Sequence, residues 1–203
     1  WIERNWLLRT GDTSYGRYIY NDISFHWARK IIMDLYGKGI VSNAVSFNPD
    51  NPVTFEEYCI FLSRTLNYIE TINQQKKIQI EKTIHYIDFT NVHSWAIDYV
   101  KDIYERGILK EKEINPIKNI TRKKAALIIE DILTSSDEHM NIDIKTIFLD
   151  LGNLTEEEIS AVKTAYINGI VSGKHIKAFC PSDYLTRAEA GVIMSNLVDK
   201  YVR

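Results

Sequence analysis

The sequence has few of the features that mark disulfide-rich or membrane-spanning proteins. It contains only two cysteines, Cys59 and Cys180, and two thiols do not make a disulfide framework. We expect both to be unpaired, because Cys59 falls in an apolar helical pattern and Cys180 in a loop. No apolar run approaches the roughly 18 residues that a membrane span needs, so no membrane span is predicted.

An excess of charge of one sign and the common catalytic motifs are also missing. The 203 residues carry 25 Lys and Arg against 27 Asp and Glu, a net charge of −2, which argues against nucleic acid as a partner. There is no phosphate-binding loop, no Gly-x-Gly-x-x-Gly, no Gly-x-Ser-x-Gly and no His-Glu-x-x-His, and the five histidines show no metal-ligand spacing. The sequence therefore predicts a non-enzyme with no catalytic residues, no metal and no cofactor, although one local basic pocket for a single anionic group remains compatible with it.

What the sequence does have is a pattern that occurs three times. Each copy begins with an aromatic-x-Asp triplet, continues through a helical pattern to a Gly-Ile pair, passes a Pro-containing loop and ends in a second helical pattern that starts at Thr. The triplets end at Asp22, Asp88 and Asp150, and the Gly-Ile pairs start at Gly39, Gly107 and Gly169.

In two of the three copies a tryptophan stands at the start of the first helix. Trp27 and Trp95 each stand twelve residues before the glycine of their copy, and the third copy has Glu157 at that position. Because glycine tolerates the left-handed conformation of a helix stop, each first helix is predicted to end at its glycine.

The second helices are predicted to start after N-cap threonines, Thr54, Thr121 and Thr186. In the first and third copies a glutamate three residues later, Glu57 or Glu189, completes a capping box. The second copy has Lys124 there, which breaks the box and opposes the helix dipole.

Apolar residues recur at helical spacing behind each of these threonines. One helix pair cannot bury both its faces, but three pairs can share a core through their second helices. The predicted fold is all-α, with three helix-loop-helix repeats that share one core through their second helices. The repeats are assigned to residues 20–70, 84–134 and 146–203, and the polar stretches 71–83 and 135–145 to linkers. Residues 1–19 match no repeat and are interpreted as the end of a preceding segment that packs on the bundle.

The ordered set of aromatic-x-Asp, His-Trp-Ala, Gly-Ile, Phe-x-Pro and Thr-Arg-Ala-Glu resembles S-layer homology domains over about residues 20–202. The first copy has the strongest start, His26-Trp27-Ala28, and the third has the strongest end, at residues 186–190. The resemblance implies a three-pronged bundle with pseudo-threefold symmetry. It implies as well that this bundle anchors a secreted protein on the surface of a bacterial cell wall, in an S-layer setting. It also implies that grooves between neighbouring repeats bind secondary cell-wall polysaccharide, often through a pyruvate-ketal-bearing sugar. Other surface-layer protein chains are further candidate partners.

The resemblance also implies roles for individual residues. In such domains the Arg of Thr-Arg-Ala-Glu pairs with the carboxylate, and the Gly-Ile turn and a Trp of the adjacent repeat line the sugar. The candidate ligand-binding residues here are Arg187, Gly169, Trp27, Glu189, Asp22, Arg122, Gly107, Trp95 and Gly39. An Arg fork can meet a carboxylate with two charge-assisted bonds, which Lys cannot match. An Arg just after an N-cap is also expected to lie beside free backbone N–H groups that favour an anion.

The three copies are not equally suited to that role. The first has Phe55 where an Arg is expected, and the second keeps Arg122 but is followed by a repeat with Glu157 in place of Trp, which would repel an anion. The resemblance therefore favours one good groove, at the junction of repeats three and one, with Arg187 as the anion fork and Trp27 from the first repeat.

Each candidate has a structural alternative. The two tryptophans are also typical of core positions at helix starts, and the aspartates of the triplets can cap a helix or brace a loop. Glu189 fits a capping box, and Arg122 fits a solvated surface position. At the level of function, a degenerate repeat module used for protein–protein interaction or surface assembly without glycan binding remains open. So does a wall-active enzyme whose catalytic domain lies upstream.

Overall fold

The computed structural model describes residues 20–75, 77–80, 88–109, 114–133 and 142–202. Within these ranges the chain forms seven α-helices and isolated β-bridges but no strand, so the all-α class is confirmed. The helices are α2 (Arg29–Gly37), α3 (Phe55–Asn73), α4 (Ile97–Glu105), α5 (Arg122–Glu130), α6 (Ile144–Ile147), α7 (Glu156–Ile167) and α8 (Arg187–Tyr201). Residues 1–19 and most of the 135–145 segment lie outside the described residues, while the start of the 71–83 segment is helical because α3 continues through Asn73.

The first helix of each repeat ends as predicted. Gly39, Gly107 and Gly169 have φ values of +73°, +76° and +71°, a conformation that costs little only for glycine. The apolar residue after each glycine closes the helix end; the N–H of Ile40, for example, donates to the carbonyl of Leu35 at 2.9 Å.

The second helices also begin where the threonines predict. Thr54, Thr121 and Thr186 each accept a hydrogen bond from the third backbone N–H of the following helix. The capping boxes with Glu57 and Glu189 are complete. The helix without a box, α5, is nine residues long against 19 and 15 for α3 and α8. A further capping box, which the sequence analysis missed, opens α7.

A closed ring of hydrogen bonds joins the three repeats just before these N-caps. The N–H of Val53 donates to the carbonyl of Leu185, that of Leu185 to Ile120, and that of Ile120 to Val53, at 2.9, 3.0 and 3.1 Å. All three residues are buried and each precedes the N-cap threonine of its repeat. The internal threefold likeness predicted from the sequence is therefore present in the backbone.

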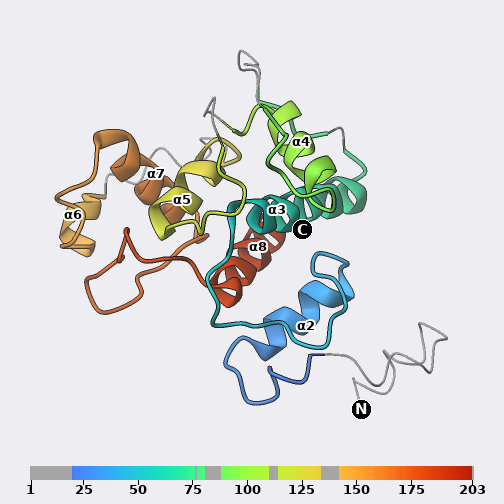
Figure 1. The fold of residues 1–203 in the computed structure, drawn as a ribbon. Coiled ribbons are helices and arrows are strands. Elements are labelled where there is room, and N and C mark those ends of the chain that lie inside the picture. The colour runs from blue at the N-terminus through green and yellow to red at the C-terminus, as the bar shows by residue number, and fades with distance from the viewer. Residues whose placement is uncertain (1–19, 76, 81–87, 110–113, 134–141, 203) are drawn as a thin grey trace.

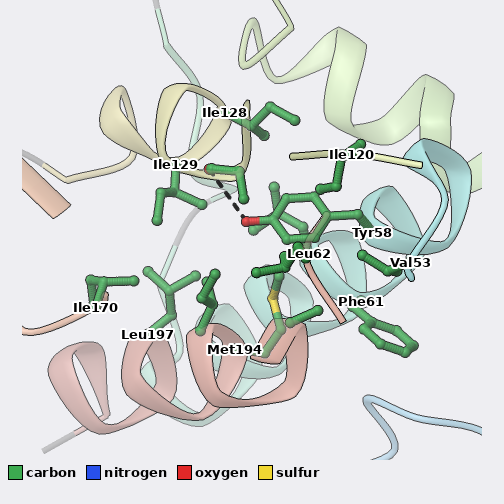
Figure 2. Packing of buried hydrophobic residues seen from close by; sticks show 14 of the residues in the cluster. Val53, Tyr58, Phe61, Leu62, Ile120, Ile128, Ile129, Ile170, Met194 and Leu197 are labelled. Atoms are coloured by element: carbon green, nitrogen blue, oxygen red, sulfur yellow. Dashed lines mark hydrogen bonds between the residues drawn. The ribbon is translucent and has the colours of Figure 1, made fainter. Parts of the chain in front are cut away.

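The core lies between the second helices. The predicted apolar positions of α3, α5 and α8 are buried apart from Tyr201, which is half-buried. Figure 2 shows Tyr58 and Leu62 of α3 pointing toward Ile129 of α5 and Met194 of α8, and the Tyr58 hydroxyl donates to the Ala125 carbonyl at 3.4 Å. Each first helix packs on the second helix of the preceding repeat, so that α4 lies on α3, α7 on α5 and α2 on α8 (Figure 1).

Candidate ligand-binding site

The N-terminus of each second helix is fixed against the loop of the next repeat. In α8 the N–H groups of Arg187 and Ala188 donate to the carbonyls of Asn51 and Pro49 of repeat 1, both at 2.9 Å. In the same way α3 binds the Pro loop of repeat 2, and α5 binds that of repeat 3. Repeat 3 therefore closes on repeat 1, but the expectation of free helix N–H groups beside the arginine is wrong, because these groups are used to join the repeats.

Arg187 lies at the junction of repeats 3 and 1, as the resemblance implied. Its Nε donates to the Phe47 carbonyl at 2.8 Å, and its Nη1 donates to a carboxylate oxygen of Glu57 at 2.5 Å. Its guanidinium stacks over the rings of Phe47 and Phe61, at 5.0 and 5.4 Å from their centres. The side chain remains 19% exposed, and among the described residues Nη2 has no hydrogen-bond acceptor. One edge of the fork is thus still available.

Arg122 has an equivalent position at the junction of repeats 2 and 3, but all its nitrogens are used. Nε donates to the Phe179 carbonyl at 2.8 Å, Nη1 to Glu189 at 3.2 Å and Nη2 to the Ser172 carbonyl at 2.7 Å. Its side chain is 9% exposed, so it is a buried residue and not a solvated surface one. Glu189 was predicted as a capping-box residue and a ligand candidate. One of its carboxylate oxygens accepts a hydrogen bond from the backbone N–H of its N-cap, Thr186, and the other accepts one from Arg122.

The glutamate partners of both arginines were missed by the sequence analysis. Glu57 and Glu189 are the capping-box residues of the repeat that follows each arginine, so each box also joins two repeats. At the remaining junction both members of the pair are changed, since Phe55 replaces the arginine and Lys124 replaces the glutamate. This double change could have revealed the pairing from the sequence, because the arginine and the glutamate that it contacts are lost at the same junction.

The junction of repeats 1 and 2 is held by a different side-chain contact, between Glu56 and His93. The carboxylate of Glu56, which is 2% exposed, lies 2.6 Å from Nδ1 of His93 and also accepts from the His93 backbone N–H at 3.2 Å. At the junction of repeats 2 and 3, Lys123 contacts Glu158 at 2.6 Å, and this bond is the main reason that the pKa of Glu158 is lowered.

The two tryptophans are surface residues, so the core alternative is wrong for both. Trp27 is 64% exposed and Trp95 is 54% exposed. Each ring lies against the histidine before it in the motif, His26 at 5.2 Å and His93 at 5.6 Å between ring centres. His26 also bonds to Asp50 at 3.2 Å, in the loop that receives the N-terminus of α8. Trp27 is therefore held near the junction that contains Arg187.

The aspartates of the first and third triplets brace the Pro loops. Asp22 accepts from the backbone N–H groups of Phe47 and Asn48 at 2.9 and 2.6 Å, and Asp150 accepts from Phe179 and Cys180 in the same way. Because Arg187 bonds to the carbonyl of Phe47, the Asp22 carboxylate supports the residue that the arginine contacts.

The three glycine turns differ in what covers them. Among the described residues, a Cβ at Gly39 or Gly169 would meet nothing within 4 Å, whereas one at Gly107 would lie 2.4 Å from the carbonyl oxygen of Ile80. Residues 77–80, one of the described parts of the first linker, therefore run over the turn of repeat 2. We call these residues the strap.

A buried arginine fixes the strap in place. Arg106 is fully buried and bonds to Glu70 at 2.5 Å and to Asp102 at 2.9 Å. Its Nη1 also donates to the Ile78 carbonyl at 3.2 Å, and its own carbonyl accepts from the N–H of Ile80 at 2.7 Å. Within the part of the chain that the structure describes, Gly107 is the one candidate glycine whose turn is covered by another segment.

Cys59 is buried, Cys180 is half-buried, and neither is in a disulfide, as predicted. Within the described ranges, no group of three or more His, Cys, Asp or Glu residues is arranged to hold a metal ion. In the same ranges, no helix is long and apolar enough to cross a membrane.

The fold and its junctions define a class of protein: a helix-pair repeat in triplicate, closed by contacts from each second helix to the next repeat. The sequence model of the S-layer homology domain family matches residues 19–59 and 86–126, which cover the first two repeats as far as the first turns of α3 and α5.

Two curated relatives align with most of this chain. An amylopullulanase of Thermoanaerobacterium thermosulfurigenes is 28% identical over 190 residues, and the exoglucanase XynX of Acetivibrio thermocellus is 27% identical over 190 residues. Each alignment covers 89% of this chain but only 10% and 16% of the two relatives. The chain thus corresponds to a small part of much longer proteins.

Proposed function

We propose that all three repeats are S-layer homology domains and that together they anchor a larger protein to the bacterial cell wall without doing chemistry themselves. The hydrogen-bond ring through Val53, Ile120 and Leu185 supports the assignment of the third repeat, because the residue before each N-cap threonine makes the same backbone contacts in all three copies. The relatives support an appended module, since two differently named carbohydrate-active proteins share this stretch as a minor part of their length. The parent protein is then displayed on the cell surface, where neighbouring surface-layer chains are its further partners.

The ligand we propose is an anionic wall polysaccharide, with a pyruvate ketal as its charged group. A ketal carboxylate is planar and charged, and it matches the flat fork of a guanidinium. The single observation that carries the proposal concerns Arg187, which is held by two aromatic rings, the Phe47 carbonyl and the Glu57 carboxylate. Its Nη2 nevertheless has no acceptor among the described residues, and its side chain is 19% exposed. The exposed ring of Trp27, on the same repeat that receives Arg187, offers an apolar face for the C–H side of a sugar.

Arg187 is favoured over Arg122 because of the partners each one has. Arg122 donates from all three nitrogens to protein acceptors, and its following repeat presents the exposed acid Glu157 in place of a tryptophan. An anion at that junction would have to displace an internal bond and approach a carboxylate, and both effects oppose binding.

The test is co-sedimentation of the purified chain with wall sacculi, comparing Arg187→Ala with a control that breaks the same ion pair from the other side. Loss of charge-assisted bonds in Arg187→Ala should weaken binding about 10-fold or more. Glu57→Gln removes the partner charge but keeps the capping function, since Gln also serves at that position, and it should bind at least as well as wild type.

Two results would contradict the proposal. If Glu57→Gln weakens binding as much as Arg187→Ala, the arginine serves only to join repeats 3 and 1. If Arg122→Ala abolishes binding while Arg187→Ala does not, the site lies at the other junction. Failure of the wild-type chain to sediment with sacculi would favour the alternative of a protein–protein or assembly module that has lost its glycan ligand.

A further inference from the structure

Arg64, in the middle of α3, is an arginine that has only neutral partners. Its Nη1 donates to the Ser42 hydroxyl at 2.6 Å and to the Ile40 carbonyl at 3.5 Å. Its Nη2 donates to the Tyr99 hydroxyl of repeat 2 at 3.0 Å, and the guanidinium lies 4.9 Å from the centre of that ring. The residue is half-buried, and among the described residues it has no ion pair with a carboxylate.

The three other arginines of the repeat junctions are neutralised. Arg106 has two carboxylate partners, while Arg122 and Arg187 have one each. Removing a charge from water without a counterion is costly, which is why partly buried charges are usually paired. The positive charge of Arg64 is the exception to this pattern, and it can be compensated by an anion from outside.

The structural role of Arg64 does not require a charge. Asn196 has the same place in α8, ten residues after the N-cap threonine, and its amide donates to the Ile170 carbonyl at 3.0 Å. Ile170 is the counterpart of Ile40, since each follows the glycine of its turn. A neutral side chain therefore makes the turn contact in repeat 3, and the guanidinium in repeat 1 adds a charge that this contact does not need.

The donors around Arg64 are suited to an oxyanion. Of its five N–H groups, three are used by the bonds above, which leaves Nε–H and one Nη2–H without an acceptor among the described residues. The hydroxyls of Ser42 and Tyr99 accept from the arginine, so their own hydrogens remain able to donate to a ligand. Ser42 and Gly39 are exposed, and nothing lies within 4 Å of the Cβ position of Gly39, so the surface beside these donors is open.

We propose that Arg64, Ser42 and Tyr99 form a second anion-binding site, at the junction of repeats 1 and 2, for a carboxylate or phosphate group of the wall polymer. This inference rests on the proposed function. The site gives this junction the cation that it lacks at Phe55, because the arginine is supplied from further along the same helix.

One residue of repeat 1, Tyr20, links the surroundings of the two proposed sites. Tyr20 is near both cations: burial raises the pKa of its hydroxyl and Tyr36 adds to this, while Arg187 and Arg64 partly offset the rise. The Tyr20 hydroxyl donates to the Ser42 carbonyl, and its ring packs against Phe47, which Arg187 contacts. Tyr20 thus contacts the surroundings of both arginines, the Ser42 turn that Arg64 of repeat 1 bonds to and the Phe47 ring over which Arg187 of repeat 3 lies.

The experiment follows the Nε–Hε resonances of the arginines by NMR while the intact chain is titrated with sodium pyruvate and, separately, with inorganic phosphate. Arg64 should shift and saturate, and the anion that saturates at the lower concentration identifies the charged group. In parallel, Arg64→Gln is compared with wild type by sedimentation with sacculi. Glutamine can still reach the Ile40 carbonyl as Asn196 reaches Ile170, and loss of the charged bonds should weaken binding about tenfold.

The two assays separate this inference from the proposed function. If Arg64 does not shift with either anion and Arg64→Gln sediments like wild type, the second site does not exist, even though the wild-type chain binds the wall. If Arg64 shifts while the wild-type chain fails to sediment, the anion site stands and wall anchoring is wrong. Circular dichroism of Arg64→Gln shows whether the variant is folded, and the NMR titration of wild type does not depend on that variant.

Discussion

Substitution of alanine for Gly107 should destabilise the protein more than the same change at Gly39. Both glycines have φ near +75°, so an added Cβ strains both backbones similarly, by about 1–2 kcal/mol. Only at Gly107 does the Cβ also meet another part of the chain, 2.4 Å from the Ile80 carbonyl oxygen, where backbone must move because no flexible side-chain end can give way.

The extra cost can be estimated from what the movement breaks. Overpacking of this kind costs about 1–3 kcal/mol, and moving the strap also strains the Ile80 N–H bond to the Arg106 carbonyl, whose loss costs about 1 kcal/mol. We therefore expect Gly39→Ala to lose about 1–2 kcal/mol and Gly107→Ala about 3–6 kcal/mol of unfolding free energy.

The assay is urea unfolding followed by circular dichroism, with Gly169→Ala as a second control because its Cβ position is also open. Hydrogen exchange of the Ile80 amide should rise in Gly107→Ala alone. Equal losses at all three positions, with the Ile80 amide still protected, would refute the reasoning that the strap closes the turn of repeat 2.

Three further predictions concern other parts of the molecule. In a thiol-reagent assay Cys180 should react in the native protein and Cys59 only after unfolding. The reason is that burial raises the pKa of the Cys59 thiol and removes it from solvent. Rapid reaction of both thiols in the native state would contradict this. Asp22→Asn should lose about 1–2 kcal/mol in urea unfolding, because the amide keeps one acceptor oxygen for two loop N–H groups, and an unchanged midpoint would oppose it. Lys123→Met should be less stable than wild type at neutral pH. The two proteins should converge as the pH falls below the ordinary pKa of a glutamate and through the lowered pKa of Glu158, because the ion pair contributes stability only while this carboxyl is ionised. A gap that persists in acid would count against the ion pair.

The local ends of the helices could be predicted from the sequence. A glycine that stops a helix and a threonine that starts one act within a few residues, so Gly39, Gly107 and Gly169 marked their turns without knowledge of the tertiary structure. The repetition of these signals then predicted the threefold arrangement, because equivalent helix pairs bury equivalent faces.

The contacts across the junctions could not be predicted in the same way. That the arginine of one repeat meets the capping-box glutamate of the next depends on the direction in which the ring closes, and Glu57 carries no local mark of this second role. The free helix N–H groups expected beside Arg187 are bonded to the loop of repeat 1 for the same reason.

Two other features had no motif to reveal them. Arg64 is an ordinary helix residue until the turn of its own repeat and Tyr99 of the next surround it. The strap over Gly107 comes from a polar segment that was interpreted as a linker, and it is held by Arg106, whose burial depends on carboxylates from two helices. The sequence also could not decide whether Trp95 is buried or exposed, since a tryptophan at a helix start fits either a core or a surface position.

The most direct measurement of the central claim compares binding of the wild-type chain to wall sacculi before and after the pyruvate ketals of the wall polymer are removed. If Arg187 grips a ketal carboxylate, sedimentation should fall to the level of the Arg187→Ala variant once the ketals are gone. Equal binding to treated and untreated walls would contradict the account.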